Sequence, residues 1–183
     1  MYKKKINAYL NLFKRTLDNV DYEELCKTLD VLQDACKKKK HIFIMGNGGS
    51  SATASHYAGD FNKGLSLDRE HKYRFIALND NAPTVLSLAN DVSYDDIFVE
   101  QLKNFLDPGD IVIAISGSGN SANIIKAAKY AHEHGNIVIG MTGFSGGKLL
   151  SYSTIKLHVP VDNMQIVEDI HMMFAHLMYY VLY

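Results

Sequence analysis

Five short apolar runs are the feature that most limits how this chain can fold. Each run spans about five residues, and segments with helical spacing of apolar side chains separate one run from the next. Short apolar runs of this kind are typical of strands buried on both faces of a parallel sheet. Strand and helix that alternate with short connections predict an α/β fold, a doubly wound five-stranded parallel sheet. The expected strands are 41–45, 74–78, 111–115, 137–141 and 155–159.

Two amphipathic segments, 5–17 and 22–38, precede the first apolar run and predict two helices. We expect residues 1–38 to form an added helical layer and residues 39–183 to form the α/β core. No Gly/Ser-rich linker or low-complexity tract divides the chain. A length of 183 residues suits one hydrophobic core, so 1–183 is predicted to be a single domain.

Composition disfavours several classes of protein. Lys plus Arg (19) nearly balances Asp plus Glu (20), so no overall positive field would attract nucleic acid. The basic amino terminus lacks the unbroken apolar run of a signal peptide, and no apolar stretch reaches the roughly 18 residues that a membrane span needs. Cys26 and Cys36 lie ten positions apart in one expected helix, too far for a disulfide. We therefore expect a cytoplasmic protein with reduced thiols and no nucleic-acid or membrane partner.

Two Gly/Ser-rich turns follow the first and third apolar runs. Residues 46–51 read Gly-Asn-Gly-Gly-Ser-Ser, and residues 116–121 read Ser-Gly-Ser-Gly-Asn-Ser. Ligands of open α/β sheets bind outside the carboxyl ends of the strands, where both turns are expected. Glycines allow close approach of an anion, and a helix amino terminus offers unpaired N–H groups. Such turns also serve as simple connections and helix caps, but two in one sheet favour a site for a phosphate monoester.

Residues 117–122 also match the dinucleotide fingerprint G-x-G-x-x-G/A, which makes a nicotinamide-binding fold a competitor. However, the fingerprint follows the third expected strand, and the next strand runs into Thr142 and Gly143 without an acidic residue to hold a ribose. Neither turn contains the G-x-x-x-x-G-K-[ST] motif of nucleotide hydrolases. The sequence therefore predicts no nucleotide cofactor.

Taken together, the motifs resemble the sugar isomerase (SIS) domain, and in particular its phosphoheptose isomerase members. The resemblance covers nearly the whole chain and includes the two leading helices. It implies a flavodoxin-like SIS fold, a homotetramer, and an aldose–ketose isomerase that converts sedoheptulose 7-phosphate to a heptose 7-phosphate. The motifs that carry it are residues 46–50, 89–91, 115–121, 170–171 and His176.

The resemblance also implies a substrate site. Ser116, Gly117, Ser118 and Ser121 would hold the phosphate, where the family pattern has Thr in place of Gly117. That change removes one hydroxyl donor and leaves the backbone N–H. The residues that would contact the rest of the substrate are Asn47, Gly48, Gly49, Ser50, Asn90, Asp91 and Glu168.

An isomerase of this kind needs a base and an acid to move a proton between neighbouring carbons. His56 and Asp60 lie four apart on the expected helix after the first turn, so they share a face, while Glu168 and His176 lie on the last helix. We interpret Asp60 as the base and His176 as the acid.

These four residues are also a candidate zinc site, because imidazole and carboxylate are ordinary zinc ligands. The family positions are His, Glu, Gln and His, and some members bind zinc there. This chain has Asp60 for the Glu and Glu168 for the Gln. The shorter Asp withdraws the carboxylate, whereas Glu168 adds charge that would strengthen metal binding. The alternative hypothesis is a non-catalytic SIS module that binds a phosphosugar or docks on a protein partner.

Overall fold

The computed structural model describes all 183 residues and contains one five-stranded sheet, with every strand parallel to its neighbours. The strand order is β2-β1-β3-β4-β5, which confirms the predicted doubly wound, flavodoxin-like arrangement. The strands are β1 (Ile42–Met45), β2 (Phe75–Ala77), β3 (Ile111–Ser116), β4 (Ile137–Thr142) and β5 (Ile155–His158).

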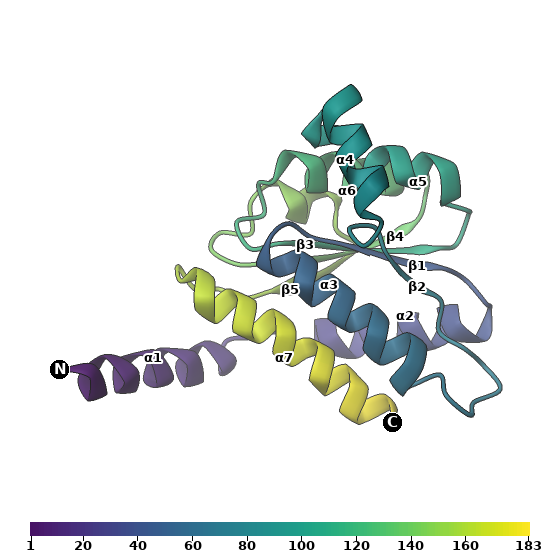
Figure 1. The fold of residues 1–183 in the computed structure, drawn as a ribbon. Coiled ribbons are helices and arrows are strands. Elements are labelled where there is room, and N and C mark those ends of the chain that lie inside the picture. The colour runs from purple at the N-terminus through teal and green to yellow at the C-terminus, as the bar shows by residue number, and fades with distance from the viewer.

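Side chains of β1 alternate between two hydrophobic cores. Ile42 and Ile44 belong to the larger core on one face, and Phe43 and Met45 to the smaller core on the other. All four are fully buried, as the continuous apolar run predicted for a strand covered on both faces. The chain therefore forms three layers, helix, sheet and helix (Figure 1).

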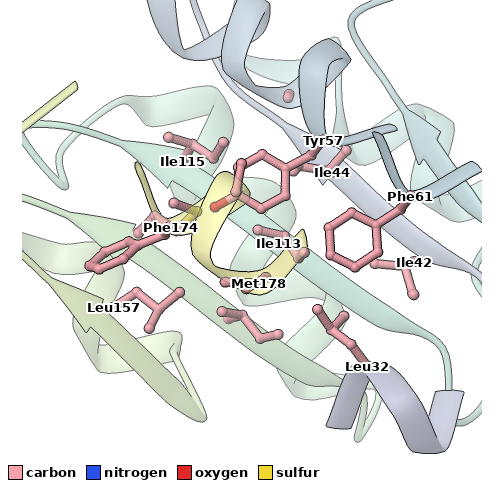
Figure 2. Packing of buried hydrophobic residues seen from close by; sticks show 14 of the residues in the cluster. Leu32, Ile42, Ile44, Tyr57, Phe61, Ile113, Ile115, Leu157, Phe174 and Met178 are labelled. Atoms are coloured by element: carbon pink, nitrogen blue, oxygen red, sulfur yellow. The ribbon is translucent and has the colours of Figure 1, made fainter. Parts of the chain in front are cut away.

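The larger core lies under α2 (Tyr22–Lys37), α3 (Gly49–Gly59) and α7 (Met164–Leu182). Figure 2 shows Tyr57 and Phe174 from α3 and α7 packed over the sheet residues Ile113 and Ile115. Burial of each such side chain contributes roughly 1.5–3 kcal/mol to folding. This packing holds α3 and α7 side by side, which matters because both helices carry candidate site residues.

The opposite face is covered by α5 (Val99–Phe105) and α6 (Ala122–Glu133). The helix α4 (Ala82–Asp91) stands above them and has no buried residue (Figure 1). A short 3₁₀ turn, η2 (Tyr94–Asp96), follows it, and a second, η3 (Lys148–Tyr152), precedes β5.

The first helix, α1 (Tyr2–Leu17), projects from the body of the molecule (Figure 1). Its carboxyl-terminal half packs on the larger core through side chains such as Phe13, whereas Ile6 and Leu10 are exposed. The Tyr9 hydroxyl donates a hydrogen bond to Asp169 of α7, and this bond raises the pKa of Tyr9 to about 12. Because α2 lies with α3 and α7 on the sheet, α1 alone of the two leading helices stands outside the layers.

The helix expected after the first Gly/Ser turn is α-helical from Gly49 to Gly59 and then continues as a π-helical turn. Residues Asp60–Gly64 form a π-helical turn, η1, in which the Leu65 N–H donates to the Asp60 carbonyl over 2.9 Å. Periodicity alone does not distinguish such a turn from α-helix, and single π turns are frequent at functional sites. No helix of the chain combines the length and the apolar character needed to cross a membrane.

Candidate functional site

The two Gly/Ser turns meet at the carboxyl edge of the sheet, because β1 and β3 are neighbours there. Chain order reverses at this point, which is where open α/β sheets bind ligands. Asn47 and Asn123 join the turns through two reciprocal amide hydrogen bonds of 2.9 Å each. Asn123 is buried in the first turn of α6 and was missed by the sequence analysis. The only signal for it was an amide side chain on an otherwise apolar helix face.

The turn after β3 concentrates hydroxyl and N–H groups. The Ser116 and Ser121 hydroxyls lie 3.0 Å apart, and the Ser118 hydroxyl accepts the Asn120 N–H over 3.2 Å. Gly119 has φ +66°, and a Cβ there would lie 1.9 Å from the Gly146 carbonyl oxygen. Glycine is therefore required at that point. Ser121 is the N-cap of α6 and makes no side-chain cap bond. The Ile124 N–H donates to the Asn123 side-chain oxygen over 2.9 Å, so the N–H groups of Ala122 and Asn123 are the ones left for an anion.

Gly117 lies against the first turn of α7. A Cβ at Gly117 would be 2.6 Å from the Met164 Sδ and 3.7 Å from the Val167 Cγ1. The Met164 side chain therefore fills the space into which a threonine at position 117 would project. The departure of Gly117 from the family pattern is thus compensated by packing from another helix.

The turn after β1 has a charged side chain from another helix, α7, next to it. Gly48 adopts φ +53° as the N-cap of α3, and Gly49 begins the helix. The Glu168 carboxylate from α7 lies over Gly49, with Oε1 3.1 Å from the position of a Cβ on that glycine. A carboxylate at a helix amino terminus interacts favourably with the helix dipole.

Asn90 and Asp91 lie at the exposed end of α4, where the Asn90 amide donates to the Asp91 carboxylate over 2.8 Å. The Tyr94 hydroxyl, three residues further on, donates to the Asn47 side-chain oxygen over 3.0 Å. This contact brings the end of α4 beside the turn after β1. The sequence analysis missed Tyr94, because nothing local marks it as a partner of Asn47.

His56, Asp60 and His176 form a cluster between α3, η1 and α7. The His56 Nε2 lies 3.0 Å from the His176 Nε2 and 3.2 Å from the Asp60 Oδ2. The three candidate ligand atoms all lie within 4.8 Å of one another. They open onto a hollow of about 350 Å³ that Lys63, Gly64 and Tyr179 also line.

The fourth expected ligand, Glu168, is not part of this cluster. It precedes His176 by eight residues on α7, which corresponds to about 12 Å along the axis of a helix. Its carboxylate lies by Gly49 at the amino end of α3, away from the three clustered side chains. The structure therefore brings three of the four expected ligands together and places the fourth at the amino end of α3.

The three clustered side chains fit a zinc ion by their chemistry and spacing. Two imidazole nitrogens and one carboxylate oxygen form a ligand set that leaves a fourth position open, as in catalytic zinc sites. Their 3.0 and 3.2 Å separations are close to the edge of about 3.3 Å in a tetrahedron with metal–ligand bonds of about 2 Å.

His171 lies on the opposite side of α7 from this cluster and is buried. Its Nε2 lies 3.2 Å from the Thr142 carbonyl oxygen, and burial lowers its pKa to about 4. A neutral, buried imidazole that does not line the hollow fits a structural role.

Comparison with known proteins supports the same family. The family model of the SIS domain matches residues 2–143. A phosphoheptose isomerase of Clostridium acetobutylicum is 36% identical over 174 residues, 94% of this chain and 88% of that protein. One from Mycobacterium tuberculosis is 38% identical over 135 residues, 74% of this chain and 68% of that protein.

Among solved structures, the phosphoheptose isomerase of Neisseria gonorrhoeae superposes with a TM-score of 0.90 at 26% identity. That alignment covers 100% of this chain and 98% of the Neisseria chain. The Neisseria structure shares the fold over the whole of this chain, and the Clostridium protein matches 94% of its sequence. The chain therefore belongs to the SIS domain family and, within it, to the group of the phosphoheptose isomerases.

Proposed function

We propose that this protein is a phosphoheptose isomerase, an aldose–ketose isomerase that interconverts sedoheptulose 7-phosphate and an aldose heptose 7-phosphate. The observation that carries the proposal is the joint position of two features. An anion-binding turn and an acid–base cluster lie on elements that start from the same edge of the sheet. The Neisseria structure shares the fold at full length, and that protein and the Clostridium relative bear this name.

The phosphate is assigned to the turn after β3. Its serines, Ser116, Ser118 and Ser121, supply hydroxyl donors, and Gly117 supplies a backbone N–H beside the amino end of α6. Contacts to the sugar hydroxyls are assigned to Asn47, Gly48, Gly49, Ser50, Asn90, Asp91 and Glu168, which gather around the turn after β1.

The reacting carbons are assigned to the hollow that His56, Asp60 and His176 line. Seven residues of α3 separate Gly49 from His56, a rise of about 10 Å along the helix. An extended seven-carbon sugar phosphate is comparable in length, so one molecule can reach from the turns to the hollow.

Within the hollow, Asp60 takes the proton from C1 of the ketose and returns it to C2. The bonding electrons of the broken C–H bond form the C1–C2 double bond of an enediolate, and the carbonyl oxygen becomes an oxyanion. His176 moves the hydroxyl proton between O1 and O2. His56 lies within hydrogen-bonding distance of both side chains and orients them.

We further propose that His56, Asp60 and His176 bind one zinc ion, which would polarise the sugar carbonyl when bound. Elemental analysis of protein purified without chelators should find about one zinc ion per chain. The His56→Ala variant should lose it. A zinc-free wild type whose stability and activity do not respond to added zinc would restrict the cluster to acid–base chemistry.

The oligomer is proposed to be a homotetramer in which neighbouring subunits complete each site. Large apolar side chains are exposed on α1 and at the end of α7, including Ile6 at 57%, Leu10 at 47% and Val181 at 61% exposure. Association would remove this surface from water. Light scattering at micromolar concentration tests the proposal, and a species of monomer mass alone would contradict it. The free thiols Cys26 and Cys36 support a location in the reducing cytoplasm.

The decisive experiment for the activity is incubation of the purified protein with a panel of ketose phosphates in D₂O, followed by NMR. Aldose formation from sedoheptulose 7-phosphate is expected, with solvent deuterium appearing at the carbon next to the carbonyl. A protein that binds ketose phosphates and never exchanges this proton would instead be a non-catalytic sugar-phosphate binding module.

A further inference from the structure

Lys63 lies in the same hollow as the acid–base cluster, although neither its sequence context nor the family resemblance drew attention to it. It follows His56 by seven residues and Asp60 by three, so all three side chains share one face of the helical segment α3–η1. Side chains on a helix lean toward its amino terminus. Lys63 therefore leans back over the turn that carries Asp60.

The other wall of the hollow is formed by Tyr179 of α7. Its ring lies on the Gly64 backbone, where a Cβ would be 2.4 Å from the Tyr179 Cε2. This close approach holds the segment that bears Lys63 against α7, one helical turn beyond His176. Lys63 is thus placed by packing at the edge of the hollow.

The ammonium group of Lys63 has no partner in the protein. None of the ion pairs or side-chain hydrogen bonds of the chain includes it, whereas Lys27, Lys38 and Lys126 pair with carboxylates. Among the residues that line the hollow, Lys63 is the one lysine and Asp60 carries the one carboxyl group. A mobile cation in this position is available to a ligand.

We propose that Lys63 is a further catalytic residue, whose ammonium group stabilises the enediolate oxyanion; this inference rests on the proposed isomerase function. When Asp60 takes the C1 proton, its negative charge is neutralised and the same charge appears on the substrate oxygen. The attraction of Lys63 is thereby transferred from the carboxylate to the oxyanion. Because this interaction arises only as the reaction proceeds, it lowers the barrier without tightening substrate binding.

The test compares Lys63→Met and Lys63→Arg with wild type in steady-state assays on sedoheptulose 7-phosphate. We expect Lys63→Met to lower kcat by about 100-fold, as loss of one oxyanion-stabilising group does, with KM within about threefold of wild type. Lys63→Arg keeps the charge and should recover activity to within about tenfold of wild type. Matching thermal unfolding of the variants would show that the fold is retained.

Lys37 provides the matched control, because it is also an exposed lysine in the last turn of a helix and has no ion-pair partner. If Lys63 only stabilised its helix through an interaction with the helix dipole, Lys63→Met and Lys37→Met would behave alike. Both variants would then keep the full kcat of wild type. The assays are run on chelator-treated and on zinc-loaded protein, with the zinc content of each variant measured. The kcat loss should persist in both forms at equal zinc content.

Three results would overturn the inference. They are an unchanged kcat in Lys63→Met, a raised KM at unchanged kcat, or a loss of activity that parallels a loss of zinc. A wild-type protein that neither isomerises sedoheptulose 7-phosphate nor exchanges its C1 proton overturns the proposed function itself, and this inference with it. An active wild type with a fully active Lys63→Met variant overturns the inference alone.

Discussion

The turns after β1 and β3 are similar in composition, yet their surroundings differ. Over the β1 turn lies the Glu168 carboxylate, 3.1 Å from the position of a Cβ on Gly49. Around the β3 turn, the neighbours of Gly117 and Gly119 are the Met164 thioether and the Gly146 backbone, both uncharged. The partial positive charge of one helix terminus already has an anion from the protein itself, whereas that of the other remains available.

The helices that the two turns begin differ as well. His56 of α3 and Asp60 of the following turn η1 lie on the face turned away from the sheet, whereas α6 packs Ala127, Ala128 and Ala131 into the smaller core. Composition alone would give both turns the same role. The proposed function assigns them different roles: it places the phosphate at the β3 turn and proton transfer beside the helix that starts from the β1 turn.

The largest expected effect concerns turnover. Asp60→Asn and His176→Ala should each lower kcat by about 100-fold or more and leave substrate affinity largely intact, because each removes a group that acts on the moving proton. Deuterium should not enter the carbon next to the carbonyl in Asp60→Asn. His132→Ala, an exposed histidine in the last turn of α6, is the matched control and should keep wild-type kcat.

A loss of substrate affinity in Asp60→Asn, without a loss of turnover, would contradict the assignment of Asp60 to proton transfer. Asp60 would then contact the bound sugar rather than the proton in transit. Calorimetric binding and steady-state kinetics on the same preparation distinguish the two results.

The next effect concerns binding. Ser118→Ala or Ser121→Ala should weaken the binding of sedoheptulose 7-phosphate by about 1–3 kcal/mol, because each variant loses a hydrogen bond to a charged group. The kcat of both variants should stay close to that of wild type. The matched substitution in the β1 turn is Ser51→Ala, which removes a hydroxyl that donates to the Gly48 carbonyl over 2.7 Å. It should change affinity by less than about 0.5 kcal/mol. Equal losses in both turns would show that the phosphate spans them.

The fold and the two turns could be predicted from the sequence because their signals are local. A strand buried on both faces requires a continuous apolar run, and a turn that approaches a ligand requires closely spaced glycines, such as Gly117 and Gly119. The contacts of Asn123, Tyr94 and Met164 could not be predicted in this way. Each depends on which distant segment packs beside it, and a single sequence contains no record of that choice.

The cluster of His56, Asp60 and His176 lies between these cases. Spacing on one helix predicts the His56–Asp60 pair, and only tertiary packing adds His176. Glu168 precedes His176 by about two turns of the same helix, and only the packing of α7 on α3 shows that its carboxylate lies at the amino end of α3.

A smaller effect is expected on stability, from the packing of α7 on the β3 turn. Gly117→Thr places a Cβ 2.6 Å from the Met164 Sδ, and overpacking of this kind costs about 1–3 kcal/mol of unfolding free energy. The double variant Gly117→Thr/Met164→Ala makes room for the new side chain and should recover much of that loss. Urea denaturation of both single variants and the double variant measures the coupling, expected at about 0.5–3 kcal/mol. If the losses of unfolding free energy in the two single variants simply added up in the double variant, the Met164 side chain would move aside freely. It would then not stabilise the β3 turn by packing.

The smallest effect tests the charge that separates the two turns. Glu168→Gln keeps the shape of the side chain over Gly49 and removes its charge, so α3 loses a favourable interaction between a carboxylate and a helix amino terminus. Unfolding free energy should fall by about 0.3–1 kcal/mol at low ionic strength. At about 1 M salt the Debye length shrinks to about 3 Å, so the difference should become much smaller for this partly exposed pair.

Glu133→Gln, at the carboxyl end of α6, is the control of opposite sign, because loss of its charge relieves an unfavourable interaction with the helix dipole. If Glu168→Gln were as stable as wild type at low salt, the Glu168 carboxylate would have no stabilising interaction with the amino terminus of α3. The two turns would then differ only in the helices that they begin, and the preference of phosphate for the β3 turn would have to come from its serines alone.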